Sequence, residues 1–161
     1  MLSGLNETRM KTLATDREQI TAAIAKFDPA VARTIRAVRA VLRKRFPTAF
    51  ELAYDNYNFF VIGYCSTERP SDCIVSIAAD VNGVNLSFYR GADVSDPRGL
   101  LIGSGKQNRF LRLPDGATTL AQPGVAELLN IAEAQAPTPM RERGALVSIM
   151  RSISLKQRPR R

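Results

Sequence analysis

The stretch CIVSIAADVNGVNLSFYR at 73–90 decides the fold. Two apolar runs flank the dipeptide Asn-Gly at 82–83, which is typical of the short turn of a β-hairpin. In the second run Val84, Leu86 and Phe88 alternate with other residues, as expected for a strand with one buried face. The sequence therefore predicts two antiparallel strands joined by a tight turn.

Three more strand-like runs lie on either side of this hairpin. AFELAY at 49–54 and NFFVIGYC at 58–65 precede it, and QNRFLRLP at 107–114 follows it. A loop that contains SDPRG leads to the last of these runs. We therefore expect about five consecutive strands in an antiparallel meander.

Helical patterns flank the strands. A capping box opens 15–27, and Asp28 with Pro29 starts a second helix that reaches about Phe46. We expect a third helix at 123–134 and a last one within PTPMRERGALVSIMRSISL. This order predicts an α+β fold, with helices packed on one face of the meander sheet.

The length and composition fit one hydrophobic core, because the chain has 161 residues and is 45% hydrophobic. We divide it into an N-terminal helical extension at 1–28, an α+β domain at 29–136, and a C-terminal helix with a basic tail at 137–161. The longest apolar run is too short to span a bilayer, and the N-terminus lacks the apolar stretch of a secretory signal. We therefore expect a cytoplasmic protein.

The net charge of +8 is concentrated in the helix before Phe46 and in the final run KQRPRR. We expect the tail to be frayed and the helix to bury one apolar stripe. That stripe is Val31, Ile35, Val38 and Leu42. Arginines on the other side are expected to face water, either as a solvated surface or as a surface for nucleic acid or another anion. These candidates are Arg33, Arg36, Arg39 and Arg43.

The letters GSGK within GLLIGSGKQNRF at 99–110 are found in many phosphate-binding loops, but their surroundings differ here. The position six residues before Lys106 is Leu100, where a glycine is required, and Gln107 occupies the place of the magnesium ligand. A strand-like run follows, whereas a phosphate loop leads into a helix. We therefore predict a glycine turn that forms a shallow anion nest, not a nucleotide site.

Two polar turns are the best candidates for a binding site, and we expect them to lie side by side. One is YDNYN at 54–58, for which a simple Asx turn is the alternative. The other is the glycine turn, where Lys106 offers a cation that we pair with Asp55. The candidate residues are Tyr54, Asp55, Asn56, Tyr57, Ser104, Gly105, Lys106 and Gln107.

The two cysteines, Cys65 and Cys73, lie at the inner ends of two strand-like runs. We expect both thiols to be reduced and on neighbouring strands, with a transient disulfide as the alternative. Two thiolates alone do not make a zinc site, and the chain has no histidine. Histidine-based catalysis is therefore excluded, and we expect no catalytic residue, metal or cofactor.

Five segments in this order resemble the YdhG-like family, a domain-of-unknown-function family. They are the basic helix, FPTAFELAYDNYNFFVIGY, SIAADVNGVNLSFYRG, GLLIGSGKQNRFLRL and QPGVAELLNIA. The resemblance covers about 31–136 and implies a frataxin-like fold, and for one bacterial branch it implies iron delivery. Frataxin-type iron handling uses an acidic ridge on the first helix, where this chain has arginines. An iron role would need another carboxylate cluster. Its members would be Asp72, Asp80, Asp93 and Asp96.

Three functions are consistent with these patterns. The favoured one is a non-enzymatic binding module for a small anionic ligand or a protein partner. The alternatives are a frataxin-like metal chaperone and a basic accessory protein that binds nucleic acid. Salt dependence separates them, because binding through many phosphates weakens steeply with salt whereas an enclosed ligand pocket is less sensitive.

Overall fold

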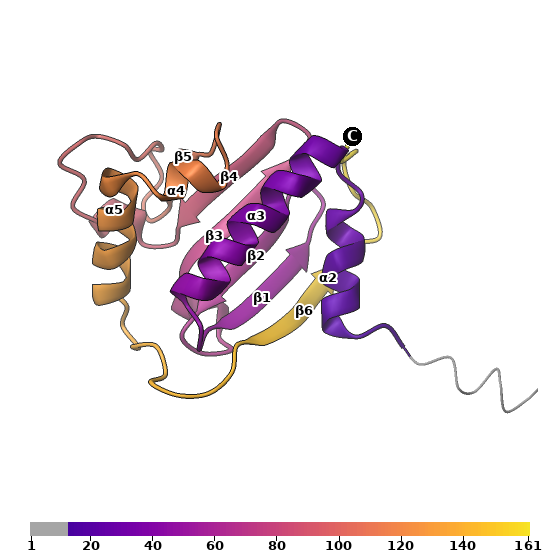
Figure 1. The fold of residues 1–161 in the computed structure, drawn as a ribbon, viewed down its shortest axis with the longest axis horizontal. Coiled ribbons are helices and arrows are strands. Elements are labelled where there is room, and N and C mark those ends of the chain that lie inside the picture. The colour runs from indigo at the N-terminus through magenta and orange to yellow at the C-terminus, as the bar shows by residue number, and fades with distance from the viewer. Residues whose placement is uncertain (1–12) are drawn as a thin grey trace, which may run out of the picture.

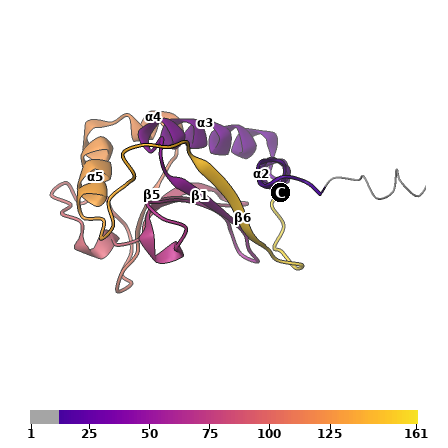
Figure 2. The same cartoon turned by 90° about the horizontal axis from the view of Figure 1, so that it is seen from below.

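The computed structural model describes residues 13–161 and contains one mixed sheet with helices on one of its faces (Figures 1 and 2). The sheet order is β5-β4-β3-β2-β1-β6. The strands are β1 (Phe50–Asp55), β2 (Phe60–Cys65), β3 (Cys73–Asp80), β4 (Gly83–Phe88), β5 (Arg109–Arg112) and β6 (Val147–Ile153). The helices are α2 (Asp16–Ile24), α3 (Pro29–Arg45), α4 (Ala117–Leu120) and α5 (Pro123–Ala134), with 3-10 turns at Pro70–Asp72 and Gly91–Asp93.

The α+β class is confirmed, but a sheet made only of a five-stranded antiparallel meander is wrong. Strands β1 to β5 pair with their chain neighbours in antiparallel fashion, and β6 then adds to the free edge of β1 in parallel. The predicted C-terminal helix is also wrong, because β6 occupies part of that segment. Its apolar residues fit either period, and the unpaired backbone edge of β1 favours a strand.

The predicted hairpin is confirmed. Ile77 lies opposite Leu86, and Asp80 lies opposite Gly83 at the turn. Gly83 has a φ of 137°, in the region that favours glycine. On the helix side of the sheet, Ala53, Ile62, Ile77 and Leu86 follow one another across four strands and are fully buried.

Helix α3 crosses this apolar face (Figure 2). Pro29 occupies its first turn, and Phe46 caps its end just before Pro47. Ile35, Val38 and Leu42 are fully buried, as the predicted stripe requires, and Val31 is half-buried. Each such burial contributes on the order of 2 kcal/mol.

Helix α2 lies beside β6 at one side of the sheet (Figure 1). Its predicted cap is present, since the Glu18 N–H donates to the Thr15 hydroxyl at 3.2 Å. The Met150 N–H of β6 donates to the Asp16 carboxylate at 2.8 Å. Within 13–161, no helix has both the length and the apolar character needed to cross a membrane.

Candidate functional site

The YDNYN turn lies beneath the C-terminal tail of the same chain. Asp55 is 1% exposed. Its Oδ1 lies 3.1 Å from Arg160 Nη2, and its Oδ2 lies 2.5 Å from Lys26 Nζ. Arg160 also donates to the Asn58 carbonyl at 3.1 Å, and its guanidinium lies 5.8 Å from the centre of the Phe27 ring. The prediction of a frayed tail is therefore wrong, because a buried carboxylate holds the tail in place.

These cations set the protonation of Asp55. Burial alone would raise the pKa of the carboxyl, but the hydrogen bonds from Lys26 and Arg160 outweigh it and lower the pKa. The carboxylate is thus ionised and fully occupied at neutral pH, which makes it a poor general base. The predicted pairing of Asp55 with Lys106 is wrong.

The other residues of this turn do not form an open site. Tyr54 points to the face opposite α3, where its buried hydroxyl has no hydrogen-bond partner among the described residues. Burial raises the pKa of this phenol. The Asn56 side chain accepts a hydrogen bond from Ser152 at 3.1 Å, and exposed Tyr57 lies 5.7 Å from the Arg158 guanidinium.

The glycine turn lies at the opposite edge and end of the sheet, so the expectation that the two turns are neighbours is wrong. The glycine turn comes directly before Arg109 at the start of β5. Cross-strand pairing connects Arg109 through Phe88, Val75 and Tyr64 to Glu51, which lies near the start of β1. Asp55 ends β1, which three strands separate from β5. Ser104, Gly105, Lys106 and Gln107 are all exposed.

The conformation of this turn depends on Gly103 and Arg109. Gly103 has a φ of 127°, in the left-handed region. The Arg109 guanidinium donates to the Gly105 and Asn108 carbonyls, at 2.8 Å for the latter. The turn is thereby closed on a side chain of its own strand, and Lys106 projects from it as an exposed cation.

A buried charge cluster on β1 was not expected from the sequence. Glu51 is fully buried and receives two hydrogen bonds from Arg39, at 2.8 and 3.1 Å. The Tyr64 hydroxyl donates to it at 2.9 Å and the Ser148 hydroxyl at 2.8 Å. Burial would raise the pKa of Glu51, but these donors, Arg39 first, lower it. The only sequence signal was a single glutamate within an apolar strand.

This cluster changes the predicted basic surface. The side chain of Arg39 is only 14% exposed, so the expectation that it faces water is wrong. Arg43 lies 3.9 Å from the same carboxylate and is about one-third exposed, while Arg33 and Arg36 are exposed as predicted. The outer face of α3 therefore presents fewer free guanidinium groups than its sequence implies.

The four aspartates required for a metal site are not brought together. Asp72 binds Thr67 and Arg69, at 2.6 and 3.0 Å. Asp96 accepts hydrogen bonds from the N–H groups of Leu100 and Leu101. Within residues 13–161, no group of three or more Asp, Glu, Cys or His residues is arranged to hold a metal ion.

A groove of about 570 Å³ lies between the first turns of α3 and the β3–β4 hairpin. Both apolar and polar residues line it. Those polar residues are Thr34, Asp80, Asn82, Asn85 and Arg112. Phe59, Val31, Val84, Phe110, Leu113 and Pro114 form most of the apolar wall. No sequence pattern predicts this groove, because its members come from four segments and individually resemble turn or core residues.

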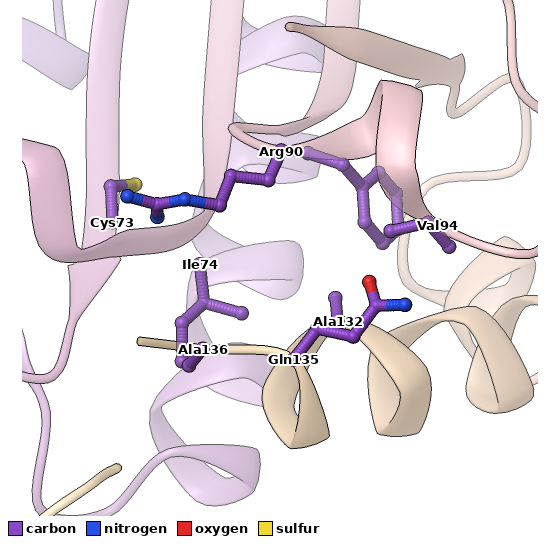
Figure 3. A pocket seen from close by; sticks show the side chains of 8 residues that line it. Cys73, Ile74, Arg90, Val94, Ala132, Gln135 and Ala136 are labelled. Carbon is purple, nitrogen blue, oxygen red and sulfur yellow. The ribbon is translucent and has the colours of Figure 1, made fainter. Parts of the chain in front are cut away.

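The two thiols lie elsewhere, and both are free. Cys65 and Cys73 face each other across β2 and β3, which confirms their predicted position on neighbouring strands. Cys73 also lines a cavity of about 20 Å³ with Arg90, Phe88 and Ala132 of α5 (Figure 3). In this view the Arg90 guanidinium is turned toward Cys73.

Comparisons of the chain with protein-family models, with curated proteins and with solved structures found no match.

Proposed function

We propose that this protein is a non-enzymatic binding module that holds a small ligand in the groove beside the β3–β4 hairpin. The ligand combines an anionic group with a flat apolar part. The observation that carries the proposal is the groove itself, whose lining of apolar residues with a few polar ones is typical of small-molecule sites. Its volume of about 570 Å³ lies in the range of such sites.

Arg112 supports the preference for an anion. It is exposed, lines the groove opposite Asn85, and has no carboxylate within ion-pair distance among residues 13–161. A guanidinium binds a carboxylate or phosphate through two parallel hydrogen bonds. Ala30 and Val31 also line the groove. They belong to the first turn of α3, and the N–H groups of a helix's first turn have no hydrogen-bond acceptor within the helix.

The polar and aromatic neighbours support the rest of the ligand description. Asp80 accepts a hydrogen bond from the Asn82 N–H at 2.8 Å, so this carboxylate is turned into the hairpin. Phe110 is half-buried and Phe59 is 41% exposed, which leaves aromatic surface available for a flat apolar group.

The buried carboxylates support a non-enzymatic role. Glu51 and Asp55 are ionised, saturated with donors and closed off from solvent, and neither lines the groove. General acid–base catalysis needs a titratable group near the reacting atoms with a pKa close to the working pH. The groove offers one arginine and one oriented aspartate, which is a recognition set and not a proton-transfer pair.

Calorimetric titration with phenyl phosphate tests the proposal, because this probe joins a phosphate to an aromatic ring. We expect saturable binding to the wild-type protein, and Arg112→Gln to weaken it by about tenfold or more. Arg143→Gln is the matched control, since Arg143 is an exposed arginine outside the groove. Benzyl alcohol, which keeps the ring and lacks the charge, should bind more weakly. Equal binding by both variants, or no saturable binding, would overturn the proposal.

A further inference from the structure

Cys65 and Cys73 lie opposite each other on neighbouring strands. They are partners between β2 and β3, at a point where the register of the two strands shifts. The strands stay paired just beyond the cysteines, because the Ser66 N–H donates to the Asp72 carbonyl at 3.3 Å. Opposed residues on paired strands are the placement that a cross-strand disulfide requires.

Gly63 provides the space in which the two sulfur atoms meet. It precedes Cys65 by two residues and shares its face of the sheet. A Cβ atom at Gly63 would lie 3.1 Å from Cys73 Sγ and 3.6 Å from Cys65 Sγ. Both sulfur atoms thus extend over the same glycine, and a side chain there would press on the Cys73 sulfur.

The two thiols differ in the way that a pair of attacking and resolving cysteines requires. Cys65 is 1% exposed, and its hydrogen bond to Cys73 together with burial raises its pKa. Cys73 is more exposed and lines the same small cavity as Arg90 (Figure 3). Cys73 is therefore the thiol that meets an external reagent first.

We propose that Cys65 and Cys73 form a reversible dithiol–disulfide site that exchanges with low-molecular-weight disulfides. The Cys73 thiolate attacks one sulfur of the reagent, which releases one thiolate and leaves a mixed disulfide on Cys73. Cys65 then gives up its proton and attacks the Cys73 sulfur, which expels the second thiol. The protein dithiol is oxidised to a disulfide, and one reagent disulfide is reduced to two thiols. This site is independent of the groove.

Oxidised glutathione and intact-mass measurement on the folded protein test this proposal. We expect the wild-type chain to lose two hydrogen atoms and both free thiols, without a retained adduct. Cys65→Ser should stop at one glutathionyl group on Cys73, because the resolving thiol is missing. Cys73→Ser should react much more slowly, since Cys65 is buried.

Gly63→Ala is the geometric control, because it keeps both cysteines and places a methyl group 3.1 Å from the Cys73 sulfur, which must then shift. We expect closure of the protein disulfide to slow by roughly tenfold in this variant, with the mixed disulfide accumulating. The proposal is overturned if the wild-type protein keeps two free thiols in excess oxidised glutathione, or if it retains two glutathionyl groups. It is also overturned if Cys73→Ser reacts as fast as Cys65→Ser.

Discussion

Arg160 of the C-terminal tail is bonded to Asp55 at the end of β1, with 3.1 Å between Nη2 and Oδ1. The two side chains are only 3% and 2% exposed, although 105 positions separate them in the sequence. The tail is thereby fastened over the end of the sheet, where it also covers part of the YDNYN turn.

Arg160→Ala should lower the free energy of unfolding by about 3 kcal/mol, because it removes one partner of a buried ion pair and leaves Lys26 as the remaining cation at Asp55. Arg158→Ala is the matched control, since Arg158 is exposed in the same tail, and its effect should stay within about 0.5 kcal/mol. Urea denaturation measures both values. Equal stabilities of the two variants would contradict the buried clamp.

Arg39→Ala should also cost about 3 kcal/mol, because Glu51 would keep its charge in a buried site after losing two hydrogen bonds. Arg36→Ala changes an exposed arginine of the same helix and should have little effect. Thermal or urea unfolding separates them. If both substitutions proved neutral, the contact between α3 and β1 would not contribute as described.

Acid should destabilise the protein through Asp55 and Glu51. Both have a folded-state pKa below the ordinary value, so their stabilising contribution is present above the unfolded pKa of about 4 and is lost as pH falls through the folded pKa. We expect the free energy of unfolding to decline below about pH 4. Asp55→Asn should make that decline less steep. An unchanged slope in Asp55→Asn would show that Asp55 does not drive it.

Removal of residues 137–161 tests the predicted division of the chain, which remains a prediction. We expect a chain ending at Ala136 to lose cooperative unfolding or to associate, because it exposes the edge of β1 and deprives Asp55 and Glu51 of Arg160 and Ser148. Thermal melting by circular dichroism and size-exclusion chromatography measure both effects. A monomer that melts cooperatively near the full-length temperature would show that 29–136 is sufficient.

Local signals predicted much of the fold. The hairpin turn within Asp80–Gly83, the Thr15 cap and the stripe of α3 each depend on neighbouring residues, and each is present in the structure. Strand β6 was missed because its pairing with β1 joins segments about a hundred positions apart. Local periodicity carries no information about such an edge.

The candidate site was predicted less well, for the same reason. Asp55 looked like a surface turn residue, and only the folded chain brings Arg160 and Lys26 to it. Arg39 looked like its exposed neighbours on α3, because the glutamate that draws it inward lies on another element. The cysteines were placed correctly, since the short segment between them limited their positions to adjacent strands.

The most direct test of the proposed function is a titration with phenyl phosphate followed residue by residue in ¹H–¹⁵N NMR spectra. We expect saturable shifts at the backbone amides of Asn82, Gly83 and Asn85 and at the Arg112 side chain, because these groups line the groove. Shifts confined to Ser104–Gln107 would assign the anion to the exposed glycine turn instead. That result, or an absence of saturable shifts in the groove, would contradict the proposal.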